Sequence, residues 1–131
     1  MSLLLDTNIC IVWLNGADPT LRKTIERAPV GDLFLCSVVK AELLYGARKS
    51  GRVSQNLERL ETFFSGMLSL PFDDEAAEVY GTVRAQLERQ GTLLGPNDLM
   101  IAAIALATDN TLVTRNDREF RAVVGLRVQV W

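Results

Sequence analysis

Short apolar runs that alternate with stretches of helical periodicity constrain the fold of this chain more than any other feature. Four runs favour β-strands, with a fifth near the end: residues 3–5, 34–36, 68–72, 111–114 and 126–130. Such alternation predicts a parallel sheet with helices on both faces, and continuously apolar strands are typical of a sheet covered on both sides. We therefore expect one α/β domain spanning residues 1–131. Its architecture would be a three-layer α/β/α sandwich around a four- or five-stranded parallel sheet.

Helix start signals follow several of these runs. Asp18-Pro19 and Gly95-Pro96 each open a helix, the second running from about residue 97 to 108. Ser37 and Asp73 are expected to cap two others. Because parallel α/β sheets place their functional sites at the carboxyl ends of the strands, the polar residues just after each run are the candidates for function.

Composition excludes several classes of protein. The 131 residues contain no histidine and only two cysteines, which excludes the usual zinc sites; we interpret Cys10 and Cys36 as buried free thiols. A net charge of −2 argues against a broadly basic nucleic-acid coat, so any attraction to nucleic acid must be local or mediated by a metal. No apolar run is long enough to be a signal peptide or to span a bilayer, which predicts a soluble, cytoplasmic protein with no membrane partner.

Asp6 ends the first apolar run, in the segment LLLDTN. Its ordinary interpretation is a helix N-cap. Thr7 and Asn8 could share that capping, which would leave Asp6 free to point out of the edge of the sheet.

Glu42 falls on the apolar arc of its helix, whereas Lys40 lies in the polar sector. A carboxylate on a core-facing arc is costly unless it is paired or bound to a metal. Two interpretations remain open: a buried ion pair with an arginine, and a place in a functional site.

Two further acidic positions adjoin predicted strand ends. Asp98 lies in the first turn of a helix that is apolar all round, where it could simply complement the helix dipole. Asn116 and Glu119 follow the fourth run with the spacing of a capping box. A cap at a strand's carboxyl end does not exclude a role in a site.

The convergence of these acids at one edge of the sheet carries the functional hypothesis. Several carboxylates crowded together cannot all stay ionised without a cation, and an all-oxygen set selects Mg²⁺, with Mn²⁺ as a substitute. Carboxylate-held Mg²⁺ is the usual apparatus for hydrolysis of phosphodiesters. We expect Asp6, Glu42, Asp98 and Glu119 to be catalytic, with the first three as metal ligands.

Four motifs in order then resemble a known family. The segments LLLDTN, SVVKAELLYGA, GPNDLMIAAIA and LVTRNDREF, the last followed by GLRVQVW, are similar to the PIN domain and specifically to its VapC toxin branch, over essentially the whole chain. The resemblance implies metal-dependent cleavage of single-stranded RNA, with Asp6, Glu42 and Asp98 at the family's acidic metal positions. Asn116 stands where many members carry a fourth aspartate, and Glu119 can compensate.

The resemblance also implies the surroundings of the site and its partners. We expect Thr7, Asn8, Thr114 and Asn116 to hold the ligands or metal-bound water through hydrogen bonds. Toxins of this branch usually form homodimers and are silenced by a VapB-like antitoxin whose C-terminal tail crosses the active site; DNA is contacted only through the antitoxin. Similar members attack structured RNA such as the anticodon loop of initiator tRNA.

One alternative belongs to another functional class. A degenerate PIN domain could serve as a binding module, because a fold survives loss of its chemistry. The presence of Asp6, Glu42 and Asp98 together speaks against that interpretation. Arg48, Lys49 and Arg52 form a small basic cluster after the third helix, a pattern more typical of a solvated face than of a binding patch.

Overall fold

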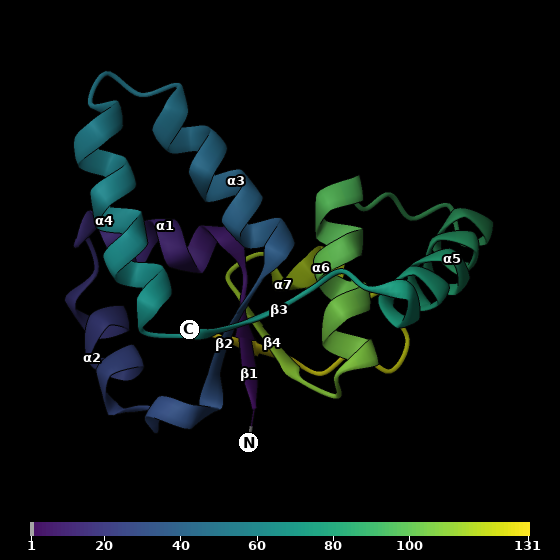
Figure 1. Cartoon of the computed structure of the whole chain (residues 1–131). Coiled ribbons are helices and arrows are strands. Elements are labelled where there is room, and N and C mark those ends of the chain that lie inside the picture. The colour runs from purple at the N-terminus through teal and green to yellow at the C-terminus, as the bar shows by residue number, and fades with distance from the viewer. Residues whose placement is uncertain (1) are drawn as a thin grey trace.

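The computed structural model describes residues 2–131 and contains one sheet of five parallel strands (Figure 1). All five predicted runs are strands. Their spatial order is β3-β2-β1-β4-β5. The bounds are β1 (Leu3–Leu5), β2 (Leu33–Cys36), β3 (Leu68–Leu70), β4 (Thr111–Thr114) and β5 (Val128–Val130).

Helices cover both faces of this sheet, which confirms the predicted α/β/α sandwich. In Figure 1, α1, α2 and α4 lie on one side of the strands and α5 and α6 on the other, while α3 rises from the upper edge. The bounds are α1 (Thr7–Asn15), α2 (Pro19–Arg27), the 3₁₀ helix η1 (Val30–Asp32), α3 (Ser37–Arg48), α4 (Val53–Ser65), α5 (Asp74–Arg89), α6 (Pro96–Ala107) and α7 (Asp117–Phe120).

Strand β1 occupies the centre of the sheet, between β2 and β4. Leu4 and Leu5 are completely buried, as their place in a sheet covered on both faces requires. Leu5 is in register with Val113, and the backbone N–H of Asp6 donates to the carbonyl of Val113 at 3.1 Å. Asp6 is therefore held at the middle of the carboxyl edge of the sheet.

Most predicted helix starts are correct, and one is not. Asp18 and Asp73 are the N-caps of α2 and α5, and α6 begins at Pro96. The N-cap of α3, however, is Cys36, and Ser37 is the first helical residue. Strand β2 runs directly into the helix, so Ser37 uses its hydroxyl to donate to the carbonyl of Leu70 at 3.5 Å.

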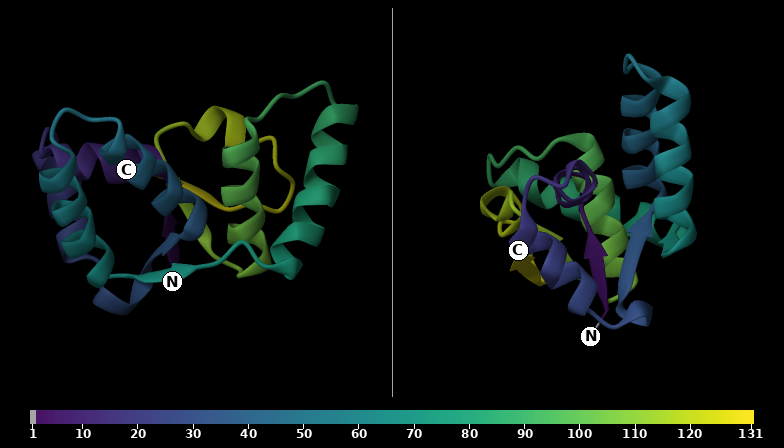
Figure 2. Two further views of the ribbon diagram at one scale, coloured as in Figure 1. Left: turned by 45° about the horizontal axis from the view of Figure 1, so that its top comes forward. Right: turned by 90° about the vertical axis from the view of Figure 1, so that its left-hand side faces the viewer.

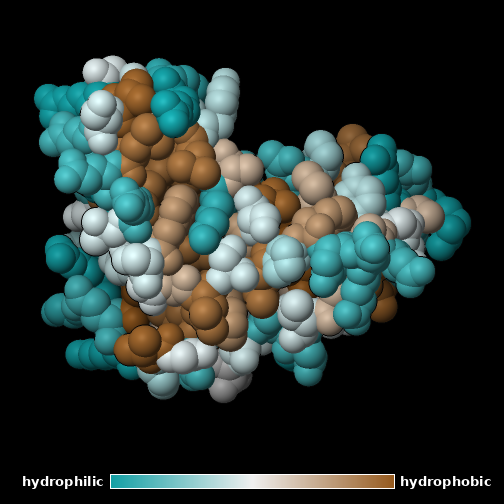
Figure 3. Space-filling model, in the orientation of Figure 1, coloured by the Kyte–Doolittle hydropathy of each residue, from teal (hydrophilic) through white to brown (hydrophobic). Residues whose placement is uncertain are grey.

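The α3–α4 hairpin and the α5–α6 pair form two lobes with a notch between them, and apolar residues gather on the flank of the hairpin lobe (Figure 3). Cys10 and Cys36 are buried free thiols, as predicted. Across residues 2–131, no helix combines the length and apolar character that a membrane crossing requires.

Candidate active site

A cavity of about 250 Å³ lies at the carboxyl edge of the sheet. Four segments far apart in the sequence meet there: the β1–α1 junction, α3, the first turn of α6 and the β4–α7 junction. The lining residues are Asp6, Thr7, Asn8, Ile11, Glu42, Asp98, Asn116 and Phe120.

Asp6 is only 4% exposed and performs the capping that Thr7 and Asn8 were expected to share. Its Oδ1 accepts a hydrogen bond from the backbone N–H of Ile9 at 2.9 Å. That expectation was wrong because Asp6 directly precedes the first helical residue, where a short side chain reaches the N3 amide. Burial raises the pKa of Asp6 and the negative charge of Glu42 adds to this, while hydrogen bonds from Thr114 and Ile9 partly offset the increase. Asp6 thus caps α1 and also faces the cavity.

Glu42 is partly exposed and is held by a residue of another helix. The hydroxyl of Thr7 donates to its Oε1 at 2.8 Å. Within the described part of the chain, Glu42 makes no ion pair with any arginine or lysine. The ion-pair interpretation therefore does not account for its position, and its carboxylate lines the cavity instead.

Asp98 occupies the third position of α6, in the first turn of a helix whose later residues are almost all buried. Its pKa is raised to about 6, first by burial and then by the negative charges of Glu42, Asp6 and Glu119. The carboxylates therefore interact electrostatically, and each disfavours ionisation of Asp98. A bound cation would remove this penalty.

Asn116 and Glu119 form a pair at the start of α7. The backbone N–H of Asn116 donates to the hydroxyl of Thr114 at 2.9 Å, and its side-chain Nδ2 donates to Oε2 of Glu119 at 3.0 Å. Asn116 is the N-cap, as expected, but its side chain makes no capping hydrogen bond, so the predicted capping box is replaced by this side-chain pair. Asn116 lines the cavity, and Glu119 lies behind it, near enough to influence Asp98.

Asp117 points elsewhere. Its Oδ2 accepts from Nε of Arg121 at 2.8 Å in an exposed pair, one turn along the chain. This pair lowers the pKa of Asp117. Asp117 is not among the residues that line the cavity.

The chemistry of the cavity fits a hydrated divalent ion better than a fully protein-enclosed one. Its polar lining offers only oxygen and amide groups, which suits Mg²⁺ or Mn²⁺. Among residues 2–131, no three His, Cys, Asp or Glu side chains already converge tightly enough to enclose an ion. Magnesium usually retains several waters and needs only one or two direct carboxylates, so the present arrangement is compatible with it.

Two apolar lining residues were not anticipated from the sequence. Ile11 is 41% exposed beside the acids, and Phe120 is almost completely buried at the floor of α7. Ile11 lies one turn beyond Thr7 in α1, so helical spacing from Asp6 could have indicated it. Phe120 offered no comparable signal, because its position depends on how α7 packs against the sheet.

The chain is similar to known ribonucleases and toxin–antitoxin complexes. A PIN domain model matches residues 3–126. The tRNA(fMet)-specific endonuclease VapC of Shigella flexneri is 40% identical over 131 residues, covering 100% of this chain and 98% of the relative. VapBC from Salmonella typhimurium bound to DNA has a TM-score of 0.94 at 36% identity, covering 100% of this chain and 98% of that one. VapBC2 from Rickettsia felis, bound to a DNA fragment from its promoter, has a TM-score of 0.93 at 34% identity, with coverage of 100% and 99%.

Proposed function

This chain belongs to the PIN-domain family and to its VapC branch of ribonucleases, and we propose that it is a Mg²⁺-dependent endoribonuclease whose active site is the acidic cavity at the carboxyl edge of the sheet. The observation that carries this proposal is the mutual electrostatic influence of Asp6, Glu42, Asp98 and Glu119 around one cavity. Structural acids would be paired with bases, whereas these face one another.

Nucleases with PIN domains generally depend on a divalent metal, and Asp6, Glu42 and Asp98 are the residues that would hold it here. Bound Mg²⁺ would polarise the phosphoryl oxygen, lower the pKa of the attacking water and stabilise the leaving oxygen. The protein's own side chains prepare this chemistry. Thr7 holds Glu42 toward the cavity, and Thr114 accepts from the backbone of Asn116.

The substrate that we propose is a single-stranded loop of a structured RNA. The Shigella relative is named for initiator tRNA, and its 40% identity over the whole chain makes that tRNA the first candidate to test. A ribonuclease toxin acts on cellular RNA, so the proposal places the protein in the cytoplasm.

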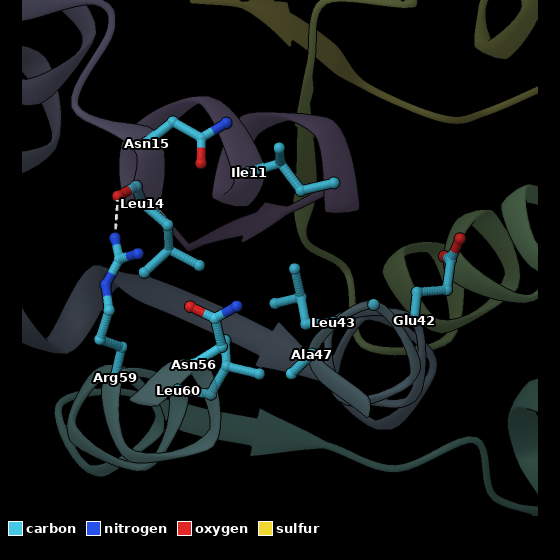
Figure 4. A pocket seen from close by; sticks show the side chains of 10 residues that line it. Ile11, Leu14, Asn15, Glu42, Leu43, Ala47, Asn56, Arg59 and Leu60 are labelled. Carbon is cyan, nitrogen blue, oxygen red and sulfur yellow. Dashed lines mark hydrogen bonds between the residues drawn. The ribbon is translucent and has the colours of Figure 1, made fainter. Parts of the chain in front are cut away.

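A second part of the proposal is inhibition by a VapB-like antitoxin. The similar solved structures are VapBC complexes, and two are bound to DNA. This chain has a pocket of about 270 Å³ between α1, α3 and α4, shown in Figure 4, which extends from Glu42 to Arg59. Leu14, Leu43 and Leu60 make its lining largely apolar. An amphipathic antitoxin segment in this pocket would reach the acidic cavity at Glu42, and any contact with DNA would be made through the antitoxin.

We also propose that the protein is a homodimer. Tyr45 is 65% exposed and lines a shallow cavity of about 360 Å³ between α3 and α6, together with Val38 and Met100. Leu44 on the same helix is also exposed. Exposed apolar side chains that border a hollow are typical of protein contacts. Light scattering of the purified chain tests this, and a monomer at micromolar concentration would exclude it.

The experiment for the whole proposal is cleavage of initiator tRNA and of total cellular RNA by antitoxin-free protein, with Mg²⁺ and with EDTA. Mapping of the new RNA ends identifies the scissile bond. If no RNA is cleaved in Mg²⁺ by protein that is folded and free of antitoxin, the protein is instead a degenerate domain that only binds.

A further inference from the structure

The α3–α4 hairpin extends beyond the carboxyl edge of the sheet, and its far end is basic. Figures 1 and 2 show the two helices standing out from the rest of the chain, joined by a short turn. Arg48 ends α3, Lys49 follows it, and Arg52 directly precedes α4. We call these three residues the basic tip. No acidic residue occurs in the sequence between Glu42 and Glu58.

The basic tip differs from the other cationic positions in lacking acidic partners. Arg22, Arg84 and Arg121 each pair with an acid one turn away on their own helix. Throughout the described chain, no ion pair is formed by any residue of the tip, and all three are exposed. The Lys49 ammonium instead lies 5.0 Å from the ring centroid of Tyr45. The tip therefore concentrates positive charge on a protein whose net charge is −2.

Helix stability does not explain this placement. Arg48 lies in the last turn of α3, where a cation complements the negative end of the helix dipole. Arg52, by contrast, is the N-cap of α4, where a cation is unfavourable and an acid or hydroxyl would stabilise the helix. Its side chain makes no capping hydrogen bond, and the first turn of α4 has no acidic residue. The N-terminus of a thirteen-residue helix thus adds its positive end to the tip.

The turn that carries the tip is held in a defined shape. The hydroxyl of Ser50 donates to the carbonyl of Ala47 at 2.6 Å and accepts from Nδ2 of Asn56 at 2.9 Å. These bonds link the end of α3 to the first turn of α4. The charges are therefore presented from an ordered scaffold, which lowers the entropic cost of binding an extended anion.

The basic tip and the acidic cavity share one helix. Glu42 and Arg48 are six positions apart in α3, which is about 9 Å along the helix axis. A strand of RNA whose scissile phosphate lies in the cavity would reach the tip within a few nucleotides. The acids of the cavity repel phosphates in the absence of metal, so a separate cationic contact would offset that repulsion.

We propose that Arg48, Lys49 and Arg52 bind backbone phosphates of the RNA substrate a few nucleotides from the cleaved bond. This inference rests on the proposed ribonuclease function. The tip suits RNA better than an acidic protein segment, because residues 48–52 include no apolar side chain that a protein partner could cover. The contact is with the backbone, so it contributes affinity rather than sequence choice.

The test compares two triple variants of equal charge. Arg48→Gln, Lys49→Gln and Arg52→Gln remove the tip. Arg22→Gln, Lys23→Gln and Arg27→Gln remove three exposed cations from α2, on another part of the molecule. For wild type and both variants, kcat/KM for a stem-loop RNA is measured over a range of salt concentrations at constant Mg²⁺. The measurement is repeated on the shortest trimmed form of that RNA that wild type still cleaves.

On the stem-loop, the tip variant should lose about 10-fold or more in kcat/KM at low salt through a higher KM. Its log–log dependence on salt should be less steep by about 2, at ~0.7 for each phosphate that the tip no longer neutralises. The α2 variant should match wild type. The defect should shrink on the trimmed RNA, which no longer reaches the tip.

Several results would overturn the proposal. An unchanged salt dependence in the tip variant, while wild type cleaves RNA, would refute the binding of phosphates by the tip and leave the ribonuclease function standing. An equal defect on the trimmed RNA would mean that the substitutions act on the cavity itself. Normal cleavage combined with weaker inhibition by antitoxin would assign the tip to the protein partner. If wild type cleaves no RNA at all, the ribonuclease function itself fails.

Discussion

The hydroxyl of Thr7 donates a 2.8 Å hydrogen bond to Oε1 of Glu42 and so joins the first turn of α1 to α3 across 35 positions of sequence. Glu42 has no cationic partner in the described residues, so this bond is what orients its carboxylate. Thr7 therefore acts on the cavity through Glu42.

Thr7→Val should keep the shape of the side chain and remove the bond. We expect the Mg²⁺ concentration for half-maximal cleavage to rise ~10-fold, in the range typical for loss of a hydrogen bond to a metal ligand, with a small effect on the melting temperature. Thr7→Ser restores a hydroxyl and should rescue most of the loss. A Ser variant as defective as Val would show that the hydroxyl is not what matters.

Glu42→Gln separates a ligand from a structural ion pair. Breaking a buried ion pair would cost about 3–5 kcal/mol of stability. Because residues 2–131 contain no such pair at Glu42, we expect thermal melts within about 2 °C of wild type and a ~10–100-fold higher Mg²⁺ requirement for cleavage. A large drop in melting temperature in the absence of metal would contradict this assignment.

Asp98→Asn should abolish cleavage and stabilise the metal-free protein at neutral pH. The pKa of Asp98 is raised to about 6 from 3.8, so the folded state binds more protons than the unfolded state between those values. Without metal, the contribution of Asp98 to stability is therefore most favourable below about pH 4 and falls as the pH rises through 6. After a discount for solvent screening at this half-buried site, the gain at pH 7 should be about 1 kcal/mol, or ~3 °C in Tm. Melts of both proteins in EDTA at pH 5 and pH 8 measure it, and the difference should shrink at the lower pH.

Substitutions at the start of α7 should fall in a definite order. Asn116→Ala and Glu119→Ala each break the 3.0 Å bond between the two side chains beside the cavity, and each should reduce cleavage clearly at limiting Mg²⁺, with partial rescue at saturating Mg²⁺. Asp117→Ala removes only an exposed pair with Arg121, worth roughly 0.3–0.5 kcal/mol, and should cleave almost normally. If Asp117→Ala were the most damaging of the three, Asp117 would be the missing fourth acid.

Metal removal is the remaining prediction. Exhaustive EDTA treatment should abolish cleavage, and Mg²⁺ or Mn²⁺ should restore it, because the cavity offers oxygen donors and no histidine or thiolate. Zn²⁺ added to the same apo protein is the control and should restore little. Activity that persists in EDTA would exclude metal-dependent hydrolysis.

The sequence predicted those parts of the fold that depend on local chemistry. Apolar runs marked the strands, and Asp18, Asp73 and Gly95-Pro96 marked three helix starts, because caps and N1 prolines act within one turn. Ser37 was misplaced by one position because β2 continues into α3 without a spacer. Strand order was not predicted, since pairing of β1 with β4 joins segments about 100 residues apart.

The candidate site was predicted as a set of residues and not as a geometry. Asp6, Glu42, Asp98 and Asn116 were expected to meet at one edge of the sheet, and they line one cavity. Two local details were wrong: Asp6 caps α1 itself, and the expected capping box is a pair between the side chains of Asn116 and Glu119. The link between Thr7 and Glu42 could not be foreseen, because it depends on how α1 packs against α3.

The central place of β1 has a consequence for a chain that is still being synthesised. Asp6 is made long before β4, yet it is positioned by β4, and the cavity is closed by Asn116, which follows that strand. A ribosome-bound or prematurely terminated chain that stops before residue 111 lacks the strand beside Asp6 and one wall of the site. Destructive activity therefore cannot precede synthesis of these late segments, and truncated products of a toxin message are harmless to the cell that makes them.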